Sequence, residues 1–325
     1  MPAIETVNLT KDFSVGFWRK RPRRVLDGLS IQVEQGEVFG RLGPNGAGKS
    51  TTLKILMRLI FPTSGTARIM GKELDDVSAH EHIGFLPENP YFYDNLTAEE
   101  FLNYAGSLFS IPAAERRRRS DRLLGQVGLD NARNIQLRKF SKGMVQRLGI
   151  AQALINDPDL IFLDEPMSGL DPLGRREVRD LILGLKEAGK TVFFSTHILS
   201  DAEMLCDRVA ILNLGRMQGC GDLKEMLGMG INSTEILLES PPLELLDELK
   251  SYCGYAVRTG ERVRMEIPKE SDVPAVLSKV LQSGAKIVSV NPVKMSLEDY
   301  FLAKVAKDNQ KAAEKELVAE AKGGR

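Results

Sequence analysis

One glycine-rich stretch constrains the fold of this chain more than any other. It fits the pattern G-x-x-x-x-G-K-[ST], with a predicted strand at 37–42 before it and a predicted helix at 53–60 after it. A strand, a glycine turn and a helix gather backbone N–H groups at the positive end of a helix dipole, where a phosphate chain can bind. The stretch consists of Gly43, Pro44, Asn45, Gly46, Ala47, Gly48, Lys49, Ser50 and Thr51.

Different residue types have different roles in this phosphate loop. The glycines let the backbone curl and come close to a ligand without Cβ clashes. Lys49 can reach the β- and γ-phosphates, the Ser50 hydroxyl can hold Mg²⁺, and Thr51 can add a phosphate contact. The sequence therefore predicts a site for a nucleotide and Mg²⁺.

Two acidic residues at the end of a strongly apolar run predict that the bound nucleotide is also hydrolysed. The run 160–163 is typical of a central parallel strand that is buried on both faces. Asp164 can hold Mg²⁺ directly or through water, and Glu165 is placed to polarise a water for attack on the γ-phosphorus. His197 follows another predicted central strand, and ligands of open α/β sheets lie beyond such strand ends. We therefore expect His197 to meet the γ-phosphate.

The composition argues against several other classes of function. A chain of 325 residues predicts about two domains, and its formal net charge of zero indicates neither a nucleic-acid nor an anionic-membrane partner. Three scattered cysteines without a CxxC pair fit a reducing compartment and argue against a disulfide framework or a zinc site. The N-terminus does not read as a signal peptide, and no apolar run approaches the roughly 18 residues of a membrane span. We expect any membrane role to pass through a partner.

The pattern of predicted elements indicates how the chain is organised. Alternating strands and helices in 1–230 predict a parallel sheet with helices on both sides, preceded by antiparallel N-terminal strands and interrupted by a helical insert at about 96–156. The order β-α-β-β-α-β in 231–306 predicts a small ferredoxin-like α+β domain. Residues 307–325 form a charged tail of Ala, Lys and Glu.

An aromatic residue ahead of the phosphate loop can stack on a nucleotide base. We favour Phe13 for this role, with Phe17 and Trp18 as alternatives. The neighbouring basic residues, and the run Arg116–Arg119 further on, are interpreted as solvated surfaces rather than as lipid or nucleic-acid sites.

Four motifs in order resemble the ATP-binding subunit of an ABC transporter, a P-loop NTPase, over about 4–227. They are the phosphate loop, Leu163–Pro166, Ser168–Asp171 and Ser195–His197. The resemblance implies Mg²⁺-dependent ATP hydrolysis, with Phe13 stacking on the adenine. It also implies that His197 is the switch histidine and that residues 168–171 form a loop that crosses a dimer interface.

The resemblance also implies a family signature at 140–144, whose Ser141 and Gly143 face the phosphates of ATP held by a second copy of the chain. The sequence departs from the family in two places. Glu88 stands where a glutamine normally senses the γ-phosphate and contacts the metal, and Lys142 and Met144 replace a glycine and a glutamine of the signature. Three segments together resemble the ATPases of ABC-2-type exporters in bacteria, namely Leu86–Asn89, Ser141–Met144 and Ser296–Phe301, and the C-terminal unit resembles the small accessory domain common in that group.

The resemblance implies a cytoplasmic protein on the inner face of the cell membrane, bound to a separate integral-membrane permease, with no nucleic-acid partner. A translation-factor relative would usually carry two ATPase cassettes, whereas this chain has one phosphate loop and one signature. An intact Glu165 argues against a purely regulatory module. We expect the permease to dock on the insert and the loop 88–95, through some of Tyr91, Phe92 and Tyr93; the alternative is that these aromatics pack beneath the insert.

Overall fold

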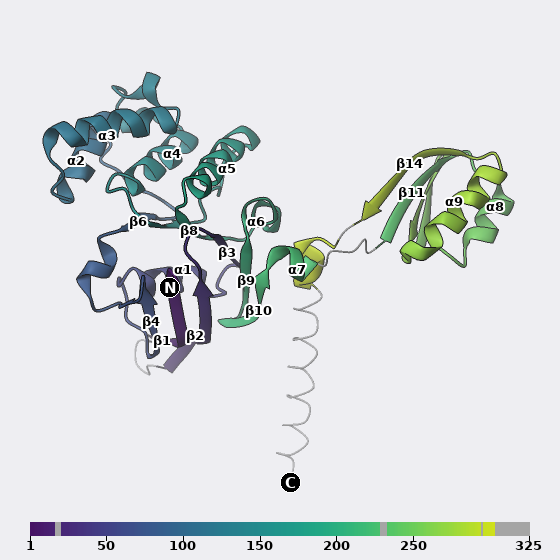
Figure 1. The fold of residues 1–325 in the computed structure, drawn as a ribbon, viewed down its shortest axis with the longest axis horizontal. Helices are drawn as coiled ribbons and strands as arrows, with labels where there is room; N and C mark the ends of the chain where they lie inside the picture. The colour runs from purple at the N-terminus through teal and green to yellow at the C-terminus, as the bar shows by residue number, and fades with distance from the viewer. Residues whose placement is uncertain (17–20, 228–232, 294, 303–325) are drawn as a thin grey trace, which may run out of the picture. The chain divides into compact units, whose positions relative to one another are not determined.

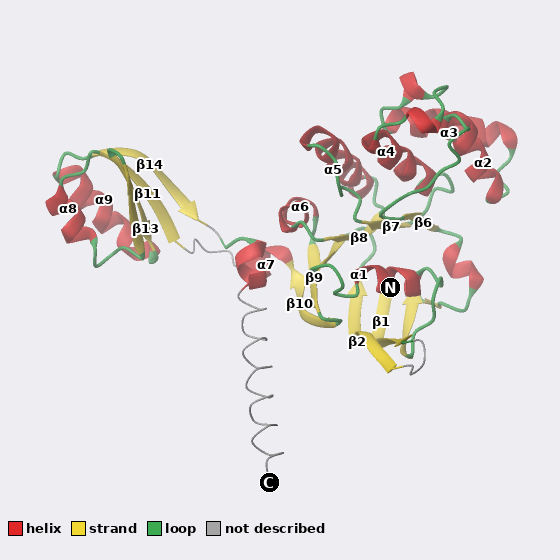
Figure 2. Cartoon of the chain, turned by 180° about the vertical axis from the view of Figure 1, so that it is seen from behind, coloured by secondary structure: helices red, strands yellow, loops and turns green. Residues whose placement is uncertain are grey.

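A computed structural model describes residues 1–16, 21–227, 233–293 and 295–302. Contacts divide the chain into two compact units, with the boundary between Leu223 and Lys224 (Figure 1). The first unit is an α/β fold with two sheets and an added layer of helices. The second is a small sheet covered by two helices (Figure 2).

The central sheet of the first unit has six strands in the order β10-β9-β3-β8-β7-β6, parallel except for β10. The strands β3, β7 and β8 are buried over their full length, which the continuous apolar run 160–163 predicted for β7. Their common carboxyl edge therefore carries the residues that follow each strand. The strands are β3 (Val38–Leu42), β6 (Ile83–Leu86), β7 (Leu160–Asp164), β8 (Thr191–Thr196), β9 (Arg208–Asn213) and β10 (Arg216–Asp222).

The N-terminal strands form a separate antiparallel sheet in the order β2-β1-β4-β5, as predicted. The first two strands are longer than their apolar alternation indicates, because pairing continues through polar residues, with Arg24 Nε 2.9 Å from Asp12 Oδ1 across the strands. The strands are β1 (Ile4–Val15), β2 (Arg21–Val33), β4 (Ser64–Ile69) and β5 (Lys72–Glu73).

Two groups of helices surround the central sheet. The predicted helix 53–60 was misplaced: α1 begins at Lys49 and ends at Leu56, because Arg58 adopts a left-handed conformation (φ 55°) that ends it. The remaining helices of this group are α5 (Pro172–Glu187) and α6 (Leu199–Leu205), whereas α7 (Leu223–Leu227) begins at the boundary between the two units. The insert contributes α2 (Ala98–Leu108), α3 (Ala113–Gln126) and α4 (Lys142–Ala153), which share an apolar core of their own.

Side-chain caps fix where the insert helices begin. Thr97 Oγ1 accepts a hydrogen bond from the Glu100 N–H (3.3 Å), and Glu100 Oε2 accepts one from the Thr97 N–H (2.8 Å), which confirms the predicted capping box of α2. Ser141 Oγ accepts from the Met144 N–H (3.3 Å) and caps α4. Figure 1 shows α2, α3 and α4 as one layer, apart from α1 and its sheet.

The second unit has the strand order β12-β13-β11-β14 with every pair antiparallel, which is the order of the predicted split β-α-β-β-α-β unit. Apolar side chains of the sheet and of both helices form one core. The elements are β11 (Ser233–Glu239), α8 (Leu243–Leu249), β12 (Tyr255–Thr259), β13 (Arg262–Ile267), α9 (Val273–Gln282) and β14 (Lys286–Val293).

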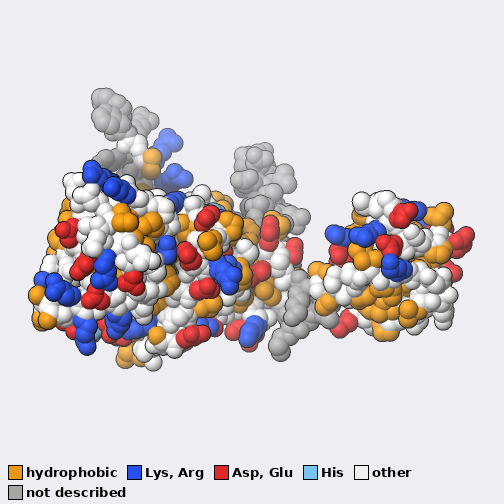
Figure 3. Space-filling model, turned by 90° about the horizontal axis from the view of Figure 1, so that it is seen from above, with side chains coloured by type: hydrophobic (Ala, Val, Ile, Leu, Met, Phe, Trp, Pro, Cys, Tyr) orange, Lys and Arg blue, Asp and Glu red, His pale blue; other side chains and the backbone are white. Residues whose placement is uncertain are grey.

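The surface of the first unit carries both signs of charge, interspersed on the face drawn in Figure 3. Within the described ranges, none of the helices combines the length and the apolar character that crossing a bilayer requires.

Candidate nucleotide-binding and hydrolysis site

The phosphate loop links β3 to α1 at the carboxyl edge of the central sheet. Gly48 precedes the first residue of α1 with φ 97°, and a Cβ there would lie 2.8 Å from the Val25 carbonyl oxygen and 2.7 Å from Leu26 Cδ2. Glycine at this position therefore permits both the turn and the close approach of β2. The N-terminal turn of α1, including Ser50, lines a cavity of about 270 Å³.

Five separate segments converge on this cavity: β2, the phosphate loop with α1, and the loops that follow β6, β7 and β8. Residues predicted from different parts of the sequence are therefore brought together, as parallel topology predicts for strand ends. The lining consists of Val25, Asn45, Gly46, Gly48, Lys49, Ser50, Thr51, Glu88, Glu165, Ser168 and His197.

A line of charged groups crosses the mouth of the site. Lys49 Nζ lies 3.2 Å from Glu165 Oε1 and donates to the Gly43 carbonyl oxygen (2.7 Å). The other carboxylate oxygen, Glu165 Oε2, lies 2.7 Å from His197 Nδ1 and accepts from the His197 backbone N–H (3.3 Å). Glu165 is 6% exposed and takes a left-handed conformation (φ 50°). The carboxylate is thus fixed between a cation and an imidazole.

Asp164 is the last residue of β7 and directly precedes Glu165. Its Oδ1 accepts a hydrogen bond from Ser195 Oγ on the neighbouring strand β8, and Ser50 Oγ lies 3.5 Å away. These contacts orient the carboxylate towards the start of α1.

This oxygen set fits a magnesium ion that also binds a nucleotide. Mg²⁺ is usually held by one or two carboxylates together with substrate phosphates and waters. Ser50 and Asp164 offer a hydroxyl and a carboxylate side by side, and Glu88 lines the same cavity as Ser50. Among the residues that the structure describes, no group of three His, Cys, Asp or Glu side chains could hold a metal without other ligands.

The signature residues lie elsewhere. Ser141 is exposed at the N-terminus of α4, in the insert layer, and neither it nor Gly143 lines the cavity. The Lys142 ammonium packs against Gly169, which has φ 68°. One chain therefore does not bring its own signature to its phosphate loop.

Phe13 lies on β1 and is 37% exposed, with Lys11 Nζ 5.1 Å from its ring centroid. It does not line the cavity, whereas Val25 on the neighbouring strand does. The alternatives Phe17 and Trp18 lie outside the described residues.

Sequence reasoning missed two residues of this site. Ser195 was quoted within a motif but not assigned a role; the usable signal was a small polar residue within a buried apolar strand. Val25 gave no signal, because its place at the cavity depends on how β2 packs against the phosphate loop.

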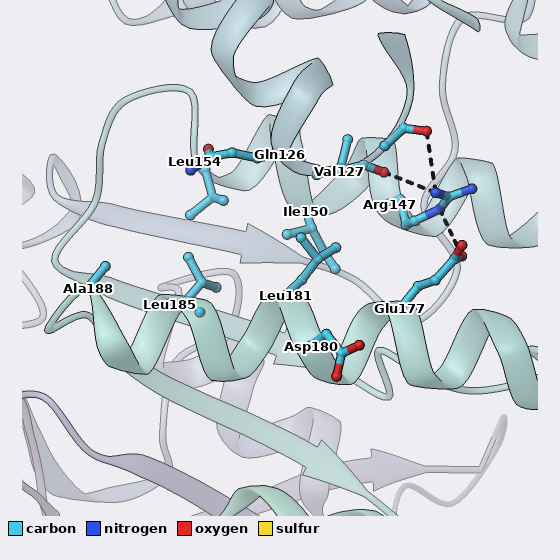
Figure 4. Close-up of a pocket in the computed structure, with 12 residues that line it drawn as sticks. Gln126, Val127, Arg147, Ile150, Leu154, Glu177, Asp180, Leu181, Leu185 and Ala188 are labelled. Carbon is cyan, nitrogen blue, oxygen red and sulfur yellow. Dashed lines mark hydrogen bonds and ion pairs between the residues drawn. The ribbon is translucent and has the colours of Figure 1, made fainter. Parts of the chain in front are cut away.

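A second cavity, of about 500 Å³, lies between the insert helices α3 and α4 and the core helix α5. Figure 4 shows an apolar wall that includes Ile150, Leu181 and Leu185, and Arg147 pointing towards Glu177, with Nε 3.5 Å from the carboxylate. This cavity is larger than that of the phosphate loop but contains no comparable set of catalytic groups. Size alone therefore does not locate the chemistry.

Comparison with known proteins decides the family. The family model "ABC transporter" matches residues 26–168. An uncharacterised ABC transporter ATP-binding protein of Synechocystis is 47% identical over 92% of this chain and 83% of its own length. The chain belongs to the ATP-binding subunits of ABC transporters. It is an ATPase of that family, and it binds ATP as a subunit of a transporter complex.

Other relatives extend the match to the whole ABC subunit. The daunorubicin/doxorubicin resistance ATP-binding protein DrrA of Streptomyces peucetius is 33% identical over 98% of both chains. Among solved structures, an ATP-binding subunit of an ABC transporter is 34% identical, with a TM-score of 0.60 over 69% of this chain and 91% of the other. A dimeric cassette, MJ0796, bound to ADP and phosphate, is 28% identical, with a TM-score of 0.62 over 68% and 99%.

Proposed function

We propose that this ABC ATPase powers export through a separate membrane permease, using Mg²⁺-dependent ATP hydrolysis. The direction is supported by the match to DrrA, whose name describes drug resistance, over nearly the full length of both chains. The chemistry is supported by one observation above all. A buried Glu165 carboxylate is fixed between Lys49 and His197 at the mouth of the phosphate-loop cavity.

In the proposed mechanism, Glu165 accepts a proton from the water that attacks the γ-phosphorus. His197 keeps the carboxylate oriented and meets the γ-phosphate. When ATP binds, its phosphates compete for the Lys49 ammonium, which frees Glu165 from its ion pair. Ser50 and Asp164 would hold Mg²⁺, which would neutralise phosphate charge.

Two further residues complete the proposed nucleotide site. Glu88 would contact the metal or the attacking water from the loop after β6, since it lines the cavity there. Phe13 would stack on the adenine, because its ring is partly exposed on a strand next to the one that contributes Val25 to the cavity.

The second copy of the chain would complete each site. The N-terminus of α4 presents the donors of Ser141 and Gly143, yet it lies away from its own phosphate loop. Two copies arranged head to tail would place each signature over the other copy's ATP. A solved cassette similar to this chain is dimeric with ADP and phosphate bound, which supports pairing of two copies.

Permease docking is proposed for the loop that follows Glu88. Tyr91 is 91% exposed, and Tyr93 is 59% exposed with its ring edge-on to Tyr104 at 5.5 Å. Phe92 points the other way: its ring centroid lies 4.4 Å from that of Phe101, against the core of the insert. Phe92 would therefore anchor the loop while Tyr91 and Tyr93 meet a permease helix at the inner face of the membrane.

Affinity purification from membranes tests the partner. The tagged chain should bring down an integral-membrane protein, and Tyr91→Ala should reduce its yield while Leu173→Ala, which changes another exposed apolar residue, should not. The direction of transport is tested by comparing the growth medium of cells that carry the wild type with that of cells that carry Glu165→Gln. Compounds enriched in the medium of wild-type cells support export, and compounds depleted from it contradict export.

A further inference from the structure

Arg41 is the most unusual residue of the central sheet. It lies in β3, the strand that leads into the phosphate loop, and is fully buried. Its Nε, Nη1 and Nη2 atoms find no hydrogen-bond partner among the described residues. A buried guanidinium without a paired acid is costly to the fold, so an apolar residue here would be more stable.

The sheet register places Arg41 in line with the proposed metal ligand. Arg41 pairs with Ser195 on β8, and Ser195 pairs with Asp164 on β7, so the three side chains share one face of the sheet. Ser195 is also the residue whose hydroxyl bonds to the Asp164 carboxylate. The Arg41 guanidinium lies 5.7 Å from the Phe193 ring centroid, in a cation–π contact within the interior.

The charge persists in this position at neutral pH. Burial lowers the pKa of Arg41 to about 9, and the nearby Asp164 and Glu165 carboxylates oppose that shift. Two buried cations, Arg41 and Lys49, therefore lie near two buried carboxylates, Asp164 and Glu165, and Lys49 and Glu165 also line the cavity. Without Arg41, this buried set would carry one excess negative charge.

We propose that Arg41 is a positioning residue that sets the electrostatic balance of the site, favouring phosphate binding and weakening premature Mg²⁺ binding. The proposal rests on the proposed Mg²⁺ site at Ser50 and Asp164. A buried charge is poorly screened, so it acts on ligands that it does not touch. It attracts the nucleotide phosphates and repels Mg²⁺ from Asp164, so that metal binds mainly together with ATP.

The test measures binding of a fluorescent ATP analogue in EDTA and during a Mg²⁺ titration. Two unit charges roughly 12 Å apart, at an effective dielectric constant of about 20, interact by about 1.4 kcal/mol, which changes a binding constant by about tenfold. Arg41→Met should therefore bind the metal-free analogue about tenfold more weakly. In this variant, the Mg²⁺ concentration that gives half of the Mg²⁺-dependent change in analogue binding should fall about tenfold. Arg41→Lys, which keeps the charge, should stay near the wild type in both.

Two outcomes would overturn the assignment. If Arg41→Met folds and its analogue affinity and half-saturating Mg²⁺ concentration both stay within twofold of the wild type, the charge of Arg41 does not act on the site. A change in only one of these two values would contradict a shared electrostatic cause. Should Arg41→Met fail to fold, Arg41→Leu repeats the test, and failure of both would make Arg41 a structural requirement. A wild-type protein without a Mg²⁺ response would instead refute the proposed metal site.

Discussion

We propose that two helix N-termini of the ATPase unit bind phosphate, and their surroundings differ. The start of α1 lines a cavity with buried Lys49 and Glu165 and a nearby hydroxyl–carboxylate pair. The start of α4 is exposed, capped by Ser141, and its first residue is Lys142. One end has the groups for hydrolysis, and the other has only donors and a cation. The difference supports a site that two copies complete together.

The largest expected effect lies at the α1 end. Glu165→Gln removes the base while keeping the shape of the side chain, so steady-state phosphate release should fall by about 10²- to 10⁴-fold. Equilibrium binding of ATP should remain. Asp180→Asn, a matched change of an exposed acid on α5 that does not line the phosphate-loop cavity, should leave the rate unchanged. Turnover within a few-fold of wild type would exclude Glu165 as the base.

Lys49→Ala should weaken binding rather than turnover alone. It deletes the cation that faces the phosphates, and losing a charged hydrogen bond of about 1.5–3 kcal/mol corresponds to roughly 10- to 100-fold in the dissociation constant. Titration with a fluorescent nucleotide measures this effect. Lys54→Ala, an exposed lysine on the same helix, is the control. Equal effects of both substitutions would show only a general loss of charge.

At the α4 end, two substitutions of Ser141 separate capping from ligand binding. Ser141→Ala loses the hydrogen bond to the Met144 N–H and should lower the free energy of unfolding by about 0.5–2 kcal/mol. Ser141→Asp keeps a capping oxygen and should unfold like the wild type in urea. Nevertheless, only Ser141→Asp places a negative charge where a partner's phosphates would bind. Normal ATPase activity of Ser141→Asp would remove this helix from the site.

The smallest effect is expected in the docking loop. Tyr91→Ala should leave basal ATPase of the isolated chain within about twofold of wild type, because its side chain has almost no contacts to lose. Phe92→Ala, in contrast, should destabilise the chain by about 1–3 kcal/mol, less than a fully buried phenylalanine, since Phe92 is only partly buried. Thermal unfolding of both variants tests the contrast, and equal melting temperatures would contradict it.

The sequence predicted those parts of the site that follow directly from strand ends. The apolar run before Asp164 and the glycines before Lys49 are local patterns, and parallel topology brings such ends to one edge. Strand β10 was missed, because its polar, glycine-containing sequence has no pattern typical of a strand. It forms because Leu214 and Gly215 turn it back onto β9 with φ 48° and 79°.

The burial of Arg41 could not be predicted from the sequence either. The sequence of a short strand before a phosphate loop does not reveal whether its arginine is buried, because an edge strand could leave the side chain in solvent. Only the order of β9, β3 and β8 shows that neighbours cover it on both sides. Local patterns likewise do not predict that a second copy of the chain binds at the N-terminus of α4. That expectation came from the resemblance of residues 140–144 to the family signature.

The shared site is tested most directly by light scattering of Glu165→Gln and of Glu165→Gln/Ser141→Asp, each with and without saturating Mg-ATP. The account predicts that the single variant doubles its mass on adding Mg-ATP. The double variant should bind ATP and remain a monomer, since its aspartate repels the partner's phosphates. A single variant that stays monomeric with bound ATP, or a double variant that dimerises equally well, would contradict a site completed by the second copy.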